Sequence, residues 1–114
     1  MFAQKNRLTK DKEFENVFKN GRSSYDKIIG LKITKNGLDY SRFGVLVSNK
    51  ISKKAVARNK IKRRVRAVIE KIGLDLKPGY DCVAITLAPI LERTYQDMEK
   101  SLVKHFKKLK TLKQ

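Results

Sequence analysis

Residues 57–72 read ARNKIKRRVRAVIEKI, a stretch that combines many cations with regularly spaced aliphatic side chains. Lysine and arginine fill six of the eleven positions from 57 to 67. When the stretch is placed on a helix at about 100° per residue, its aliphatic side chains gather on one side. They are Ile61, Val65, Val68, Ile69 and Ile72. This pattern predicts a helix over about residues 53–72, packed on a sheet by its apolar side.

The other side of this predicted helix is basic. Arg58, Lys62 and Arg66 recur at intervals of four residues, and Asn59 and Arg63 form the neighbouring ridge. Guanidinium groups bind phosphate at two points, and the asparagine amide can contact a base edge, a ribose or a phosphate. Successive turns lie about 6 Å apart, which is comparable to the phosphate spacing of a nucleic acid strand. The face is therefore predicted to bind a sugar-phosphate backbone rather than to be merely solvated.

The charge of the whole chain supports this prediction. The net charge is +17 and the pI is about 10.2, which points to nucleic acid before an anionic membrane. No acid occurs from residue 40 to residue 69, so the cations of this segment repel one another unless a polyanion accepts them. Those cations are Arg42, Lys50, Lys53, Lys54, Arg58, Lys60, Lys62, Arg63, Arg64 and Arg66.

Length and cysteine content limit the class of protein. The 114 residues fit a single domain over residues 1–114. Cys82 is the only cysteine, which excludes an internal disulfide and suits a cytoplasmic location. No apolar run approaches the roughly 20 residues of a membrane span, and the N-terminus has no apolar signal segment. The chain is therefore expected to be cytoplasmic and not to bind a membrane, and the sequence implies no protein partner.

Turn and capping residues predict the remaining elements. A helix is expected from Asp11 to Asn20, ended by a left-handed Gly21, and strands over residues 25–34, 42–48 and 80–87. Asn36-Gly37 predicts a hairpin between the first two of these strands. Ser52 is expected to cap the long helix and Thr94 the last one. The order is about α-β-β-(β)-α-β-α, the parenthesis being an extra short strand within residues 21–34. This is an α+β fold, an α/β sandwich with helices packed on one sheet.

Several segments, in their order along the chain, resemble segments of the bacterial ribonuclease P protein component. Residues 57–66 are similar to the family's RNR signature, and residues 6–8 and 13–21 resemble its N-terminal arm and first helix. Residues 41–50 and 80–85 resemble the strands before and after the signature. The resemblance implies the fold of a domain of a small-subunit ribosomal protein. It also implies a noncatalytic subunit of an endoribonuclease that removes the 5′ leader of precursor tRNA.

The same resemblance implies partners and roles. The RNA subunit of the enzyme would hold the magnesium ions and hydrolyse the phosphodiester, with no organic cofactor. The protein would bind that RNA and the leader of precursor tRNA. Residues matching RNA-contact positions are Arg58, Asn59, Lys62, Arg63 and Arg66, and neighbouring cations expected to contact RNA are Lys53, Lys54, Lys50, Arg42 and Arg7. Phe14 and Phe18 match leader-cleft positions, and Lys32 stands where many relatives place an aromatic residue.

Other readings remain open at the level of sequence. Phe14 and Phe18 fit an ordinary amphipathic helix core as well as a base-stacking role. Asp26, Asp39 and Asp81 could hold a hydrated magnesium ion, although a protein metal or catalytic site is not expected. His105 is expected on the surface, and Cys82 in the core.

Two other classes of nucleic-acid-binding protein also fit the size and charge. A ribosomal-type structural protein is one, although the chain lacks its usual long basic extension. A DNA-binding regulator is the other, but it would need a second helix just before residue 53.

Overall fold

The computed structural model describes residues 3–73 and 75–112. Its helices and strands follow the predicted order, with the extra short strand present and two short 3₁₀ helices added. In chain order the elements are η1 (Gln4–Asn6), α1 (Asp11–Asn20), β1 (Arg22–Tyr25), β2 (Ile29–Lys35), β3 (Arg42–Leu46), α2 (Ala55–Gly73), β4 (Tyr80–Thr86), η2 (Ala88–Glu92) and α3 (Tyr95–Lys108). The α+β prediction is confirmed.

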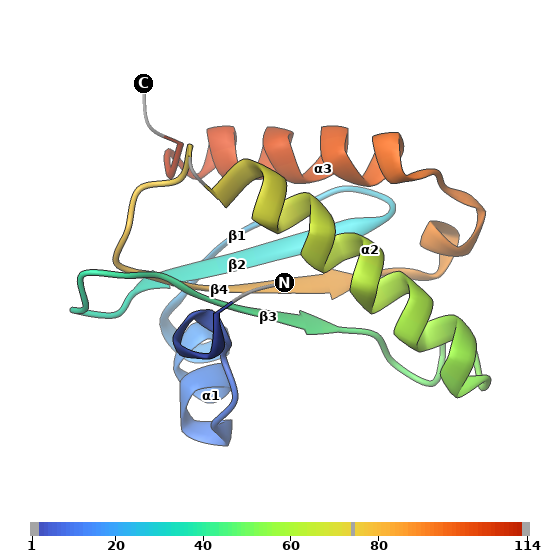
Figure 1. Cartoon of the computed structure of the whole chain (residues 1–114), viewed down its shortest axis with the longest axis horizontal. Coiled ribbons are helices and arrows are strands. Elements are labelled where there is room, and N and C mark those ends of the chain that lie inside the picture. Colours follow the sequence, from blue (N-terminus) through green and yellow to red (C-terminus); the bar gives the residue numbers. More distant parts are fainter. Residues whose placement is uncertain (1–2, 74, 113–114) are drawn as a thin grey trace.

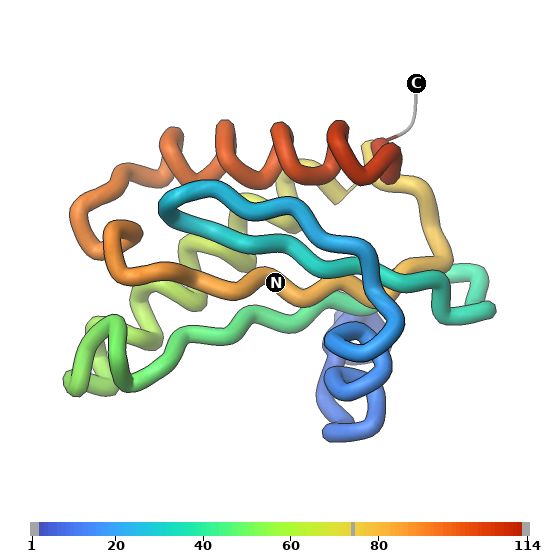
Figure 2. Tube along the Cα trace, turned by 180° about the vertical axis from the view of Figure 1, so that it is seen from behind, coloured from blue at the N-terminus to red at the C-terminus, as the bar shows by residue number. Residues whose placement is uncertain are grey.

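The four strands form one sheet in the order β1-β2-β4-β3, antiparallel except for the parallel pair β3 and β4. Helices α2 and α3 cover one face of the sheet, and α1 lies against the other (Figure 1). Figure 2 shows from behind that α1 covers only part of its face, near the start of β1. The sheet thus has one closed face and one partly open face, called here the open sheet face.

The main core lies between the closed face and the two helices. All five aliphatic residues predicted to anchor the long helix are buried there, together with β2 residues such as Leu31 and α3 residues such as Phe106. A smaller cluster under α1 contains Leu8, Val17 and Val83. None of the described helices combines the length and the apolar character needed to cross a membrane.

The predicted hairpin between β2 and β3 is wrong, although its turn is present. Gly37 has φ +74°, and the Oδ1 of Asn36 accepts a hydrogen bond from the N–H of Leu38. The two strands do not pair, because β4 lies between them. The apolar β4 satisfies β2 and β3 at once, and α2 supplies the long crossover that a parallel pair requires. Local turn chemistry could not reveal this long-range competition.

The end of α1 differs from expectation at Gly21, whereas the start of α3 does not. Gly21 has φ −80°, so it is not a left-handed cap. Glycine is instead required by crowding, since a Cβ there would lie 2.4 Å from the carbonyl oxygen of Val17 and 2.9 Å from that of Ile33. At α3 the prediction is confirmed: the Thr94 side chain accepts from the N–H of Asp97, and the Asp97 carboxylate accepts from the N–H of Thr94.

Candidate nucleic-acid interface

The outer side of α2 carries the predicted cations in the predicted arrangement. We call Arg58, Asn59, Lys62, Arg63 and Arg66 the basic face of α2. Asn59 and Arg63 are exposed and the other three are half-buried, so none of the five side chains is buried in the core. The buried aliphatic side of the helix fixes its orientation on the sheet, so the cations must point outward. From Arg58 to Arg66 the face extends about 12 Å along the helix axis.

These cations are not neutralised within the described part of the chain. The described ion pairs involve none of them, and Arg58 instead donates from Nη1 to the carbonyl oxygen of Ser52 at 2.8 Å. Among described residues, the nearest acid along the helix is Glu70, one turn beyond Arg66. Uncompensated cations on a rigid helix favour the binding of a polyanion.

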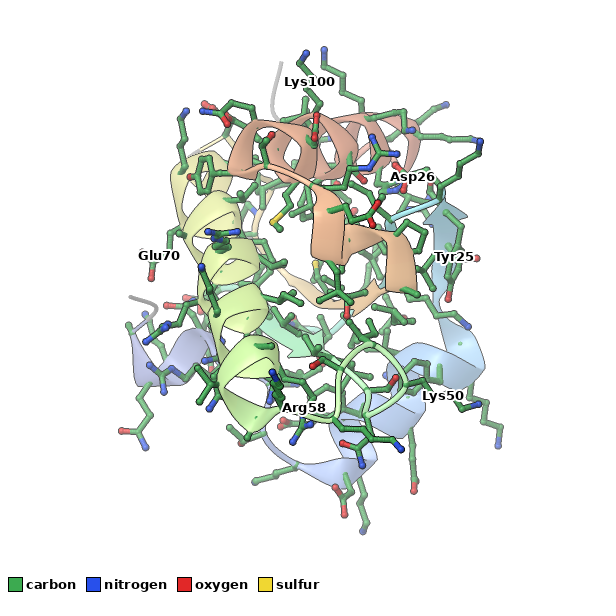
Figure 3. The ribbon with its side chains drawn as sticks, turned by 90° about the vertical axis from the view of Figure 1, so that its right-hand side faces the viewer. Tyr25, Asp26, Lys50, Arg58, Glu70 and Lys100 are labelled. Atoms are coloured by element: carbon green, nitrogen blue, oxygen red, sulfur yellow. The ribbon has the colours of Figure 1, made fainter. Side chains whose placement is uncertain are left out.

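The loop before α2 adds further positive charge. Lys50, Lys53 and Lys54 are all exposed, and Figure 3 shows Lys50 and Arg58 toward the same end of the molecule. The helix begins at Ala55, so the prediction that Ser52 is its N-cap is wrong. Ser52 organises the loop instead: its Oγ accepts from the N–H of Lys54, and its carbonyl holds Arg58.

The two remaining cations predicted to contact RNA behave differently from the rest. The guanidinium of Arg42 lies on the open sheet face and donates to the carboxylates of Asp81 and Glu13. Its first role is therefore to join β3, β4 and α1, which the sequence did not suggest. Arg7 is half-buried beside Phe43 of β3, and its Nε has no hydrogen-bond partner among the described residues.

On the open sheet face, the predicted leader-cleft residues divide into two kinds. Phe14 packs into the small core, where its ring covers Gly44 so closely that a Cβ there would lie 2.7 Å from Cε1. Phe18 is 40% exposed, and the Nζ of Lys32 stands 5.5 Å from its ring centre. Phe18 and Lys32 thus form a cation–π pair at the surface, whereas Phe14 mainly supports α1.

The predicted site residues therefore fall on two surfaces. The basic face of α2 belongs to the closed side of the sheet, while Phe18 and Lys32 belong to the open sheet face. The structure does not bring them into one pocket. The arrangement suits a protein that contacts RNA on two sides.

The carboxylates considered for magnesium do not fit a shared site. Asp81 is paired with Arg42, and Asp26 accepts hydrogen bonds from Ser101 and from the N–H groups of Ile28 and Ile29. Burial opposes ionisation of Asp26, but these hydrogen bonds outweigh it and hold its pKa well below the usual range. No group of three metal-binding side chains occurs among the described residues.

The prediction that His105 lies at the surface is wrong. Its ring is 0% exposed, with Nδ1 at 2.7 Å from the Oγ of Ser24 and Nε2 at 2.9 Å from the carbonyl oxygen of Ile29. Burial lowers the pKa of the imidazole. The position on α3 offers a signal: His105 follows Met98 and Leu102 at intervals of four and three residues, on the apolar stripe.

Comparison with known proteins identifies the family. Residues 2–110 match the family model for ribonuclease P. The chain is 38% identical over 97 residues to a ribonuclease P protein component of Clostridioides difficile, covering 83% of each chain. It is 36% identical over 106 residues to one from Clostridium botulinum, covering 92% of this chain and 95% of that one.

Solved structures agree with this assignment. The RNase P protein of Staphylococcus aureus superposes with a TM-score of 0.85 at 28% identity, covering 94% of this chain and 97% of that one. The RNase P protein of Thermotoga maritima gives a TM-score of 0.78 at 31% identity, covering 86% and 92% respectively. Together with the order of strands and the basic face of α2, these matches show that the chain belongs to the bacterial ribonuclease P protein family.

Proposed function

We propose that the basic face of α2 and the lysines of the preceding loop bind the RNA subunit of ribonuclease P. The observation that carries this proposal is the acid-free segment from residue 40 to residue 69, whose cations stand on a helix fixed by its buried side. Arginine forks spaced along one ridge can contact successive phosphates, and the Asn59 amide, which can both donate and accept a hydrogen bond, adds a further polar contact.

The open sheet face is proposed to bind the 5′ leader of precursor tRNA. Phe18 presents an aromatic surface to solvent, and Lys32 beside it can neutralise a phosphate. Aromatic stacking tolerates any base, at about 1–3 kcal/mol per base. Such tolerance suits a leader whose sequence differs among tRNAs. Phe14 contributes mainly by holding α1 on the sheet.

Hydrolysis is proposed to be carried by the RNA subunit with its magnesium ions. Three carboxylates of the described residues, those of Asp81, Glu13 and Asp26, are already engaged by protein donors, and this supports the division. The protein acts by binding and positioning, and we further propose a cytoplasmic location for the complex.

Reconstitution with a bacterial ribonuclease P RNA and a precursor tRNA tests the proposal. Arg63→Ala should weaken assembly with the RNA subunit and reduce the slope of log K against log salt by about 0.7–0.9, the effect of one phosphate contact. Phe18→Ala should leave assembly intact and weaken binding of precursor tRNA. Lys100→Ala, on the exposed side of α3 away from Arg58, is the matched control that removes a charge elsewhere (Figure 3).

Two outcomes would contradict this assignment. Processing at low magnesium that does not change when the protein is added would remove the role in ribonuclease P. Co-sedimentation with ribosomal subunits, combined with indifference to precursor tRNA, would favour the ribosomal alternative. The DNA-binding alternative lacks its structural requirement, because the segment preceding α2 is the strand β3 and a loop.

A further inference from the structure

One row of residues crosses the open sheet face beyond the part that α1 covers. Strand register aligns Tyr25 with Gly30, Gly30 with Ile85, and Ile85 with Leu46. In the adjacent row Lys32, Val83 and Gly44 are aligned, and there α1 packs over the sheet.

The outer row keeps an apolar surface in solvent. Tyr25 is 47% exposed, Leu46 is 37% exposed, and Ile85 between them is half-buried. The row crosses three gaps between strands, or about 14 Å at about 4.8 Å per gap. This strip is therefore long enough to contact more than one nucleotide of an extended strand.

Tyr25 is fixed in place by the absence of a side chain at Gly30. A Cβ on Gly30 would lie 2.0 Å from Cε2 and 2.3 Å from Cδ2 of the ring. The ring therefore rests on the backbone of β2, while its other surface stays accessible. Its position is set before any ligand binds, so stacking a base on it costs little side-chain entropy.

The surroundings favour RNA over an acidic or apolar peptide. Exposed Lys27 follows Tyr25 at the turn into β2, and Lys32 lies two residues beyond Gly30 on the same face. The nearby Asp26 is directed to Ser101 and Lys104 of α3 rather than to this strip. Figure 3 places Tyr25 and Glu70 of α2 on opposite sides of the molecule, so the strip is separate from the outer part of α2.

A tyrosine covering a glycine can also serve stability alone, as an aromatic cross-strand pair. Such a role requires contact with Gly30 but not an accessible second surface in line with Leu46 and near Lys32. Because both features are present, we propose that Tyr25 is a base-stacking residue for single-stranded RNA, supplied by the edge strand β1. The inference rests on the proposed function and extends the leader path from Phe18 and Lys32 across the sheet to β1.

The test measures equilibrium binding of the reconstituted holoenzyme to precursor tRNA with a long leader and to mature tRNA. Tyr25→Leu, which keeps an apolar cover over Gly30, should weaken binding of the long-leader substrate by about tenfold. It should change the affinity for mature tRNA less than about twofold. Tyr25→Phe should bind like wild type. Gly30→Val keeps the tyrosine but displaces its ring, and should reproduce the loss.

Failure of this inference is distinguishable from failure of the proposed function. If Phe18→Ala and Arg63→Ala have their expected effects while Tyr25→Leu binds the long-leader substrate as wild type does, the stacking role is overturned. Equal losses for long-leader and mature substrates would also overturn it, because they would indicate a structural effect. Urea unfolding of each variant, with Tyr25→Phe as reference, shows whether the fold is retained.

Discussion

Arg42 on β3 and Asp81 on β4 form a two-point ion pair, with Nε at 2.8 Å from Oδ1 and Nη2 at 2.7 Å from Oδ2. The Nη1 of the same guanidinium donates to Glu13 on α1. Glu13 also accepts from the N–H groups of Thr9 and Lys10 at the start of that helix. One arginine thus joins two strands of the sheet to the helix that borders the proposed leader-binding surface.

Removing Arg42 should therefore destabilise the fold. The carboxylate of Asp81 is only 2% exposed, so Arg42→Ala leaves a buried charge with Asn36 as its remaining side-chain donor. Breaking a buried pair from one side costs about 3 kcal/mol. Urea unfolding measures this loss, and Lys62→Ala on the surface of α2 should change stability by less than about 0.5 kcal/mol. A loss in Arg42→Ala no larger than in Lys62→Ala would show that the pair is not structural.

The buried His105 should make stability depend on pH. Burial lowers its pKa, while the charge of Asp26 acts in the opposite direction and the cations Lys104 and Lys108 lower it further. The carbonyl of Ile29 requires Nε2 to be the donor, so neutral Nδ1 accepts from Ser24.

Proton linkage determines whether His105 makes the protein more or less stable as the pH falls. The unfolded state, with an imidazole pKa near 6.5, binds the proton more readily than the folded state. The contribution of His105 is therefore fully present above about pH 6.5 and is lost as pH falls toward the lower folded pKa. Its slope cannot exceed about 1.4 kcal/mol per pH unit.

Chemical unfolding between pH 7.5 and 4.5 measures this slope. The stability of His105→Gln should fall less steeply than that of wild type as the pH drops below about 6.5. Asp26 acts at lower pH, because its folded pKa is depressed below 3.8 and its contribution is lost only as pH falls below that value. Parallel curves for wild type and His105→Gln would contradict the assignment of the slope to this histidine.

The sequence predicted those features that depend on local periodicity. The aliphatic spacing of α2 placed its buried side correctly, and this determined where Arg63 and its neighbours point. Sequence patterns did not predict the features that depend on contacts between distant parts of the chain. Asn36-Gly37 forms its turn, but β4 pairs with both β2 and β3 and separates them. Arg42 was predicted to contact RNA because it is a cation in a basic segment, but carboxylates distant in sequence bind its guanidinium. The stacking surface of Tyr25 likewise depends on cross-strand register with Gly30.

The thiol of Cys82 should report on unfolding. It is buried in β4, and burial raises its pKa far above the usual range, with the neighbouring Asp81 acting in the same direction. Only the thiolate reacts with disulfide reagents, so labelling requires opening of the sheet. Labelling at pH 8 should be at least about a thousandfold slower in native buffer than in urea. Rapid labelling without denaturant would show that the β3–β4 pair opens locally.

Two glycines at helix ends should respond oppositely to alanine. A Cβ on Gly21 would collide with the backbone carbonyls of Val17 and Ile33, and backbone atoms cannot rotate away as a side chain can. Gly21→Ala should therefore cost about 1–3 kcal/mol. Gly73 is the last residue of α2, and a Cβ there would meet nothing within 4 Å. Gly73→Ala should be neutral or stabilise by up to about 1 kcal/mol, because alanine has less freedom to lose on folding.

The comparison of these two variants is a measurement of packing at the open sheet face. Both replace glycine by alanine at a helix end, so differences in intrinsic propensity largely cancel. Equal shifts of the melting temperature for both variants would contradict the close approach of α1 to β2 at Gly21. With the expected opposite shifts, Gly21→Ala should also weaken precursor tRNA binding, because displacement of α1 moves Phe18 away from Lys32. Gly73→Ala should leave that binding unchanged.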